Sequence, residues 1–366
     1  MKQNLPKKIA IIYSGAKSWG GIETYLELLF ANADRAKVNL TLLSLGSWPL
    51  TRKLPNAEYR VRTLAGGRFR IRTVFEISKC LRKDSIDLVV SQGTVANAYA
   101  RAASLLSGVQ SLVTVHSDPY FDYPNSFVRF VYAVVEHLTR FPTKHYIAVS
   151  EYLKKKLMAA GVKADKVSVI LNGVKDPGLD SRLRGNDGGG VVVIGSIGRL
   201  HKVKNYVELI RACSKLHITN YKLLIIGEGS ERSNLEKQIA ELGLRDKVEL
   251  VGNVDDVSEL MSQIDFYVQP SLSEGFGLTV VEAMLAGKPV IVSPCGSLPE
   301  LVEDGNTGIV MKSTGAVDIA KAINGLLSNK ERAQELAVAG QAYAVSNFGV
   351  EKWVNETEKT YMEAAK

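Results

Sequence analysis

Residues 271–300 read SLSEGFGLTVVEAMLAGKPVIVSPCGSLPE, and this stretch predicts a loop, a helix and a strand in that order. A Gly-Phe-Gly turn lies between two carboxylates, Glu274 and Glu282. The apolar run after the turn predicts a helix that ends at Gly287 and Pro289, because glycine is favoured just past a helix and proline cannot continue one. Five residues typical of a buried strand follow. The stretch therefore indicates an α/β fold with one acid in a loop and the other inside a helix.

A glycine-rich loop that leads into a helix suits an anion, because its free N–H groups and the positive end of the helix dipole face one point. Acids at the same place suit hydroxyl groups. A sugar nucleotide offers both, with phosphates for the N–H groups and hydroxyls for the acids. Such a turn with a glutamate also occurs in unrelated α/β proteins, so the rest of the chain must decide between a binding site and an ordinary turn.

Strand and helix patterns alternate along the whole chain, which favours two parallel, doubly wound α/β domains. We expect an N-terminal domain over 1–175, a Gly-rich linker over 176–190, a C-terminal domain over 191–345, and a last helix in 346–366 that crosses back to the first domain. Strands are predicted at 9–13, 40–45, 88–91, 112–115, 146–149, 167–170, 191–196, 222–226, 248–250, 266–269, 290–293 and 307–310. Helices are predicted at 23–33, 95–106, 151–159, 205–215, 231–242, 257–263, 279–286, 317–327 and 350–365.

Composition points to a cytosolic globular protein. The 366 residues are 46% hydrophobic and 23% charged, which is ordinary for that class. No apolar run approaches the ~20 residues that span a bilayer, and the N-terminus does not read as a secretory signal. Three widely separated cysteines predict neither a disulfide nor a cysteine-built metal site.

The basic charge is concentrated in the first half of the chain. Residues 1–171 hold 25 Lys and Arg against 12 Asp and Glu, a net +13, whereas the remainder holds 21 against 26, a net −5. The densest basic stretch, 60–83, interleaves arginine and lysine with Phe69, Ile71 and Phe75. This pattern is typical of a solvated helix face or of a helix face that binds an anionic membrane surface. Nucleic acid is disfavoured, because no recognised nucleic-acid motif is present.

Three further motifs follow predicted strands. Arg199 and Lys204 lie in a strand-to-helix loop, where a guanidinium and an ammonium suit a diphosphate and can stabilise it as it leaves. Gly20-Gly21 allows close backbone approach to a ligand, but the GxGxxG dinucleotide pattern is absent. His116 ends a strand, where an acid/base role, a sugar-orienting role and a structural role all stay open. No metal-binding motif is present.

Taken in order, these motifs resemble the GT4 family of retaining, nucleotide-sugar-dependent glycosyltransferases, which have the GT-B fold of two Rossmann-like domains facing a cleft. The resemblance covers nearly the whole chain, and its last block is the specific one. The matching segments are GGIE (20–23), TVHSD (114–118), AVSEYLKKKL (148–157), NGV (172–174), GRLHKVKN (198–205) and EGFGLTVVEAMLAGKPVIVS (274–293).

The resemblance implies a role for each matching residue. Arg199 and Lys204 are similar to the pair that holds the donor diphosphate, Glu282 to the acid that binds the ribose, Glu274 to the acid beside the donor sugar, and His116 to the histidine near that sugar. The remaining donor-binding residues implied are Gly20, Gly21, Asn253, Val254, Gly275, Phe276, Gly277, Leu278 and Thr279.

The expected activity is transfer of a hexosyl unit, with retention and without a metal or other cofactor. The expected donor is a UDP- or GDP-sugar, and the expected acceptor is a glycan or a lipid-linked acceptor in cell-surface polysaccharide or lipopolysaccharide biosynthesis. The protein is expected in the cytoplasm or on the inner face of the plasma membrane. One departure is that a single glycine, Gly296, precedes Pro299-Glu300 where the family tends to have two. A sugar-nucleotide epimerase and a non-catalytic sugar-nucleotide-binding module are the alternatives.

Overall fold

The computed structural model describes residues 5–15, 19–54, 60–64, 70–118, 126–176, 178, 190–254 and 256–366, with the side chain of Tyr132 also left out. Within these residues the chain forms two compact units. Unit 1 is Met1–Gly173 with Val350–Lys366, and unit 2 is Val174–Gly349. Most of the Gly-rich segment expected as a linker, and Arg68 and Phe69 of the basic stretch, lie outside the described residues.

Unit 1 is built on a seven-stranded parallel sheet with the order β3-β2-β1-β4-β5-β6-β7. Its strands are β1 (Lys7–Tyr13), β2 (Val38–Leu45), β3 (Arg60–Leu64), β4 (Leu88–Gln92), β5 (Gln110–Val115), β6 (Thr143–Ala148) and β7 (Val167–Val169). Its helices are α1 (Gly21–Asn32), α2 (Pro49–Lys53), α3 (Ile71–Lys83), α4 (Thr94–Ser107), α6 (Ser126–Thr139), α7 (Glu151–Ala159), η1 (Ala164–Lys166) and α15 (Val350–Ala364).

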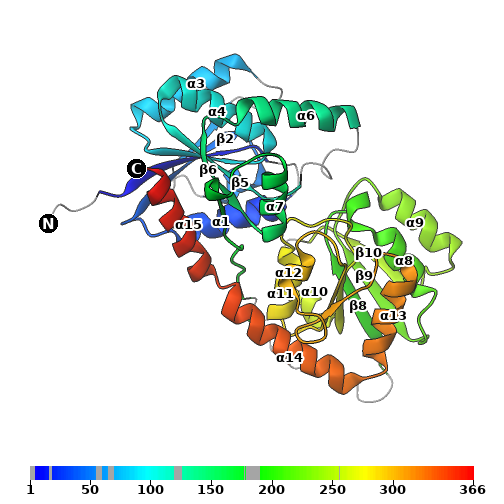
Figure 1. Cartoon of the computed structure of the whole chain (residues 1–366). Helices are drawn as coiled ribbons and strands as arrows, with labels where there is room; N and C mark the ends of the chain where they lie inside the picture. Colours follow the sequence, from blue (N-terminus) through cyan, green and yellow to red (C-terminus); the bar gives the residue numbers. More distant parts are fainter. Residues whose placement is uncertain are drawn as a thin grey trace. The chain divides into compact units, whose positions relative to one another are not determined.

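Alternate residues of β1 point into two separate cores of unit 1, because side chains alternate across a strand. Ile9 and Ile11 pack with α1 and α15, including Trp353, whereas Ala10 and Ile12 pack with α3 and α4. Figure 1 shows α1 and α15 on one side of the sheet and α3 and α4 on the other. The helix predicted at 350–365 is therefore part of the first unit's core.

Unit 2 is built on a six-stranded parallel sheet with the order β10-β9-β8-β11-β12-β13. Its strands are β8 (Val192–Ile197), β9 (Tyr221–Ile226), β10 (Val248–Gly252), β11 (Phe266–Gln269), β12 (Val290–Val292) and β13 (Ile309–Val310). Its helices are η2 (Lys202–Lys204), α8 (Tyr206–Cys213), α9 (Arg232–Glu241), α10 (Ser258–Gln263), α11 (Leu278–Leu285), α12 (Leu298–Leu301), α13 (Ala316–Leu327) and α14 (Lys330–Asn347).

Every strand predicted from the sequence is present, and the two sheets confirm the α/β prediction. Among the described residues, the elements that the sequence did not predict are β3, α2, α3, α6, α12, α14 and the short 3-10 turns η1 and η2. The basic stretch 60–83 is thus an edge strand followed by a helix, rather than one helix face. None of the helices in the described part of the chain is both long enough and apolar enough to span a bilayer.

Candidate functional site

The strand order of unit 2 places its candidate residues at the point where the sheet reverses direction of winding. From β8 the chain winds to β9 and β10 on one side, and then to β11, β12 and β13 on the other. Open α/β sheets bind ligands beyond the carboxyl ends of the strands at such a switch point. Lys204 follows β8, and Glu274 follows the neighbouring strand β11. The two predicted donor-site segments therefore meet at one sheet edge.

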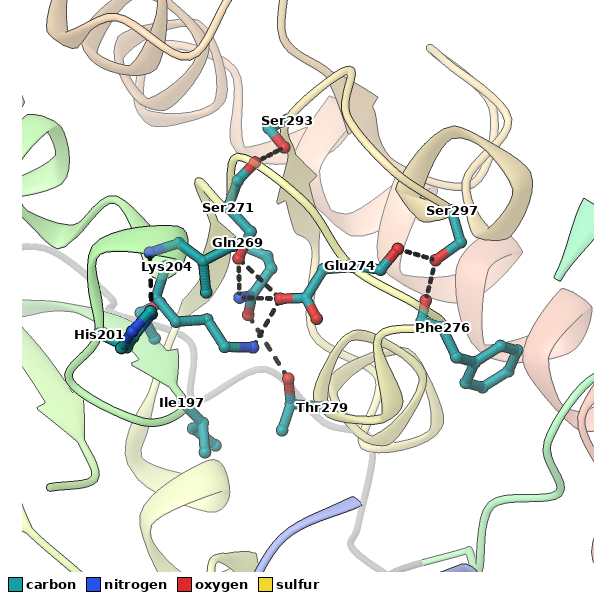
Figure 2. A network of polar contacts seen from close by, with 12 residues as sticks. Ile197, His201, Lys204, Gln269, Ser271, Glu274, Phe276, Thr279, Ser293 and Ser297 are labelled. Atoms are coloured by element: carbon teal, nitrogen blue, oxygen red, sulfur yellow. Dashed lines mark hydrogen bonds and ion pairs between the residues drawn. The ribbon is translucent and has the colours of Figure 1, made fainter. Parts of the chain in front are cut away.

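Glu274 is the centre of a polar network in this edge (Figure 2). Its Oε1 receives Lys204 Nζ at 2.6 Å, Ser271 Oγ at 2.7 Å and Gln269 Nε2 at 3.0 Å. The Lys204 and Glu274 side chains are only 16% and 13% exposed. A partly buried ion pair with two further donors holds both charged groups in fixed positions.

The network continues to the start of α11. Tyr267 OH donates to Gln269 Oε1 at 2.5 Å and lies 2.7 Å from Thr279 Oγ1. Because the Gln269 carbonyl is engaged by the tyrosine, its amide group is turned toward Ser271 and Glu274. Gln269 and Ser271 therefore act with Lys204 to orient the Glu274 carboxylate, and the buried Tyr267 holds Gln269 in place.

Hydrogen bonds from one main-chain N–H and one asparagine side chain hold the two loops in place. Leu272 N donates to Val203 O at 2.7 Å. Asn205 adopts a left-handed conformation (φ 59°) and donates from Nδ2 to Pro270 O at 3.1 Å and to Thr314 O at 2.9 Å. Asparagine is among the few residues other than glycine that tolerate this conformation. It ends the short η2 turn and leaves Lys204 facing Glu274.

The Gly-Phe-Gly turn is clamped by the segment that departs from the family pattern. A Cβ at Gly296 (φ +65°) would lie 2.4 Å from Glu274 N, so only glycine lets this segment approach the loop. The adjacent Ser297 Oγ donates to Phe276 O at 2.7 Å and to Glu274 O at 3.2 Å. Gly277 (φ +102°) then begins α11. Gly296 and the Ser297 hydroxyl therefore seat the turn together.

The other predicted donor residues of unit 2 lie around this edge without joining the network. Arg199 follows β8 and is exposed, and its guanidinium has no hydrogen bond or ion pair with the described residues. Glu282 lies within α11, partly exposed, and burial raises the pKa of its carboxyl to about 7. Asn253 and Val254 follow the outer strand β10. Arg199 and Glu282 are thus charged groups that a ligand could satisfy.

In unit 1, Gly20 and Gly21 form the start of α1, directly after β1 in the described chain. Beside them the buried Glu23 carboxylate accepts a hydrogen bond from Tyr13 OH, and a Cβ on Gly20 would lie 3.2 Å from Glu23 Oε2. Burial and the neighbouring Glu23 raise the pKa of the Tyr13 hydroxyl. Tyr13 and Glu23 therefore form a fixed pair behind the Gly-Gly turn.

His116 follows β5 and is held by neutral neighbours. Its Nε2 is hydrogen-bonded to Gln92 Oε1, and its ring packs edge-on against Tyr25 at a centroid distance of 4.7 Å. Gln92 Nε2 donates to Thr114 Oγ1 at 3.3 Å, so Oε1 is the acceptor and Nε2 of His116 carries the proton. Burial lowers the pKa of His116 to about 3. The imidazole is neutral at pH 7, which favours an orienting role over an acidic one.

Several residues of these two edges were not predicted from the sequence. Gln269, Ser271 and Ser297 orient the Glu274 loop, and Gln92 orients His116. All four are uncharged, and only their tertiary positions give them a role. The sequence offered one signal for two of them. Gln269 and Gln92 are the last residues of the strands β11 and β4, at the end of the sheet where ligands bind.

Two family models match the chain. The model described as Glycosyltransferase Family 4 matches residues 19–176, and the model described as Glycosyl transferases group 1 matches residues 185–343. Together they extend over both units.

Curated relatives match parts of the chain. A protein named as an uncharacterized glycosyltransferase of Methanocaldococcus jannaschii is 34% identical over 53% of this chain and 54% of its own length. A GDP-mannose-dependent alpha-(1-6)-phosphatidylinositol monomannoside mannosyltransferase of Mycolicibacterium smegmatis is 29% identical over 47% and 48%. The lipopolysaccharide core biosynthesis glycosyltransferase LpsE of Rhizobium meliloti is 28% identical over 43% and 46%. The chain thus spans about half the length of the curated relatives it matches.

Solved structures match the fold over almost the whole chain. The structure of Anabaena HepE in complex with UDP and glucose superposes with a TM-score of 0.82 over 97% of this chain and 99% of that one, at 23% identity. At this identity the likeness establishes the architecture, which is the GT-B arrangement of two parallel-sheet α/β domains.

Proposed function

The chain belongs to the GT4-type glycosyltransferases with the GT-B fold, and from this we propose that it moves a hexosyl unit from a UDP- or GDP-sugar to a glycan or lipid-linked acceptor, with retention of configuration. The observation that carries the proposal is the Lys204–Glu274 network at the switch point of unit 2. It puts a cation, a carboxylate and a helix start at one sheet edge, and a sugar diphosphate needs all three.

In the proposed donor site, the two phosphates lie over the start of α11, where the N–H groups of Leu278 and Thr279 begin the helix. Lys204 and Arg199 neutralise the diphosphate, and Glu274 accepts hydrogen bonds from the sugar hydroxyls. Glu282 accepts the ribose hydroxyls. Arg199, which has no partner among the residues that the structure describes, and Glu282, whose carboxyl pKa is raised by burial, support these roles, because each gains a partner when donor binds.

We propose that reaction proceeds by departure of the nucleoside diphosphate and attack of the acceptor hydroxyl on the same face of the sugar. The bond between the anomeric carbon and the phosphate oxygen breaks, the bond to the acceptor oxygen forms, and the acceptor proton passes to the departing phosphate. Lys204 and Arg199 stabilise the negative charge that develops on the leaving group. Glu274 is kept as a sugar-binding group by its three donors rather than as a nucleophile.

For unit 1 we propose that neutral His116 orients the donor sugar and that Gly20 and Gly21 approach its phosphates. The low pKa of His116 supports this role, because the imidazole keeps one N–H and one lone pair over the whole physiological range. Gln92 positions the ring.

For the acceptor we propose a glycan or glycolipid of the cell surface, handled at the inner face of an anionic membrane. Two relatives support this class: the phosphatidylinositol monomannoside mannosyltransferase and the lipopolysaccharide core glycosyltransferase. The net charge of +13 in residues 1–171 also supports an anionic surface as partner.

A donor screen tests the proposal. Nucleotide release from UDP-, GDP- and ADP-sugars is measured with and without bacterial glycolipid acceptors, and the anomeric configuration of the product is read by NMR. We expect release from one UDP- or GDP-sugar, stimulated by acceptor, with retention. Epimerised donor without release would favour the epimerase alternative, and an inverted product would refute the stereochemical proposal.

The same assay tests the proposal that no metal is needed. Because Lys204 and Arg199 supply the positive charge, we expect the rate to be unchanged in EDTA. A rate that collapses in EDTA and returns with Mg²⁺ or Mn²⁺ would contradict it.

A further inference from the structure

Helix α6 of unit 1 turns its apolar residues toward solvent. Phe130 is 66% exposed, Leu138 is 69% exposed, and Phe141, two residues after the helix, is 71% exposed. The exposed apolar set on this helix is Phe127, Phe130, Val131, Val134, Val135 and Leu138. Positions 127, 130, 131, 134 and 138 recur at helical spacing on one face. Surface helices usually bury such a face, so this orientation needs a cause.

The cause is a polar anchor on the opposite face of α6. Arg101 of α4 is 1% exposed and donates to Glu136 Oε1 at 2.5 Å and to Thr139 Oγ1 at 3.2 Å. It also reaches Thr143 Oγ1 at 2.9 Å, at the start of β6. A buried guanidinium is costly to leave unpaired, so this anchor fixes which side of α6 faces the protein. The apolar face is therefore held outward by the fold.

Basic and apolar residues also share the outer side of α3, which packs on α4, the helix that carries the α6 anchor. Ile71 and Phe75 are exposed, as are Arg72, Lys79 and Lys83. The acid on this helix, Glu76, is paired with Arg72 at 3.1 Å. Figure 1 shows α3, α4 and α6 in one layer over the sheet. We call this layer, with the apolar face of α6 and the cations of α3, the α3–α6 surface.

We propose that the α3–α6 surface docks on an anionic lipid bilayer, with the apolar face of α6 lying in the interface and the α3 cations at the headgroups. Charge selects the occupant: a helix with aromatic and aliphatic residues on one face and lysine and arginine nearby matches an anionic lipid interface. The inference rests on the proposed membrane-associated acceptor and assigns the residues that make the contact.

Vesicle co-sedimentation of the full chain tests the docking surface. The vesicles are phosphatidylcholine alone or equal parts phosphatidylcholine and phosphatidylglycerol. We expect binding to the anionic vesicles, and a drop of about tenfold or more in the partition coefficient for the double variant Phe130→Ser, Leu138→Ser. The matched control is Val317→Ser, Val338→Ser, which removes two exposed apolar side chains of unit 2, and should bind as the wild type does.

A second measurement uses a reporter on the helix itself. In a Leu138→Trp variant, we expect a blue shift of the added tryptophan emission with anionic vesicles, and quenching by brominated acyl chains. No shift and no quenching would overturn the placement of α6. Lys79→Glu with Lys83→Glu should weaken binding to anionic vesicles while leaving the low residual binding to phosphatidylcholine unchanged.

Other outcomes separate this inference from the proposed function. UDP and GDP affinity of every variant is measured by calorimetry, and equal affinity shows that the site of unit 2 is intact. If the wild type binds vesicles but neither UDP nor GDP, the proposed function is contradicted and the docking surface is supported. Equal vesicle binding by wild type and the double variant would overturn the docking surface. So would a wild-type dimer that the double variant converts to monomer without any vesicle binding, because the face would then be a self-interface.

Discussion

The two units use the same edge of similar sheets in different ways. In unit 2 the charged pair Lys204 and Glu274, after β8 and β11, is at the centre of the network, and two uncharged donors, Gln269 and Ser271, support it. In unit 1 Gln92, the last residue of β4, and His116, directly after β5, form a neutral pair, backed by the buried aromatic ring of Tyr25. Both pairs lie on adjacent strands of a parallel sheet.

Under the proposed mechanism, the two units have different tasks. A charged, preorganised edge acts on a group whose charge changes during reaction, because fixed charges do not have to reorganise when new charge develops. A neutral edge can orient hydroxyl groups without attracting the negatively charged leaving group away from Lys204 and Arg199. We therefore expect substitutions in the unit 2 network to slow chemistry strongly, and substitutions in the unit 1 pair to have smaller effects.

The largest expected effect is that of Lys204→Ala. Loss of one contact to the departing diphosphate should slow transfer by roughly 10²-fold, measured as single-turnover rate at saturating donor. Lys202 lies in the same η2 turn, is exposed, and makes no side-chain bond with the described residues. Lys202→Ala is therefore the matched control and should keep the wild-type rate. If Lys204→Ala also kept it, the charged edge would have no part in the chemistry.

The next effect concerns Glu282 and pH. Burial raises the pKa of this carboxyl from 4.5 to about 7, so it is half-protonated near neutral pH. The ionised form accepts hydrogen bonds from the two ribose hydroxyls more strongly than the neutral acid, so donor affinity should rise as pH goes from 6 to 8. Glu282→Gln should flatten this rise and weaken donor binding about tenfold at pH 8. Calorimetry with UDP or GDP measures both effects, and a pH slope kept by the glutamine variant would assign it to another group.

The stability of the ligand-free protein should change in the opposite sense. A carboxyl with a raised pKa in the folded state stabilises below its unfolded pKa of 4.5, and that contribution is lost as pH rises through about 7. Glu282→Gln should therefore raise the free energy of unfolding at pH 8, by of order 1 kcal/mol, and have little effect at pH 4. Denaturant unfolding at pH 4 and pH 8 measures this free energy. A Glu282→Gln variant that is less stable than the wild type at pH 8 would contradict the burial argument.

Whether an element was predicted from the sequence depended on how local its signal is. The buried strands were predicted because short apolar runs between turn residues have few alternative structures. Helix α14 was missed because its buried face is made largely of small residues, Ala333, Ala337, Gly340 and Ala344 among them, which give no apolar period. Helix α6 was missed because the polar anchor that orients it comes from α4. Edge strand β3 alternates Arg60 and Arg62 and read as part of a basic helix.

The candidate site divides in the same way. Charged residues in glycine-rich loops, such as Lys204 and Glu274, were predicted because few structural roles need a cation or acid there, and the structure brings these two together. Uncharged residues such as Ser297 and Gln92 were not, because serine and glutamine occur everywhere and only tertiary contact gives them a task. Their proposed roles are the easiest to test.

Ser297→Ala should have a moderate effect. The hydroxyl spans two carbonyls of the Gly-Phe-Gly turn, on Glu274 and Phe276, and its loss removes about 1 kcal/mol of loop restraint. We expect kcat to fall about fivefold, on the scale of one hydrogen bond, with the thermal midpoint lowered by only a few degrees. Ser262→Ala, which removes a hydroxyl bonded to Glu259 O in α10, is the control. A rate unchanged by Ser297→Ala would mean that Gly296 alone seats the turn.

The smallest effect should be that of Gln92→Ala in unit 1. His116 would keep its place against Tyr25 and lose only the acceptor that fixes its tautomer, so we expect kcat to fall about threefold, with KM for the donor nearly constant. Gln110→Ala, at the opposite end of β5, is the control and should not change kcat.

A sharper test of the same pair is Gln92→Glu. Its carboxylate favours the imidazolium and should raise the pKa of His116 from about 3 toward the range where NMR follows its titration. If the Gln92→Glu variant transferred sugar faster than the wild type, the reaction would not require a neutral pair at this edge of unit 1.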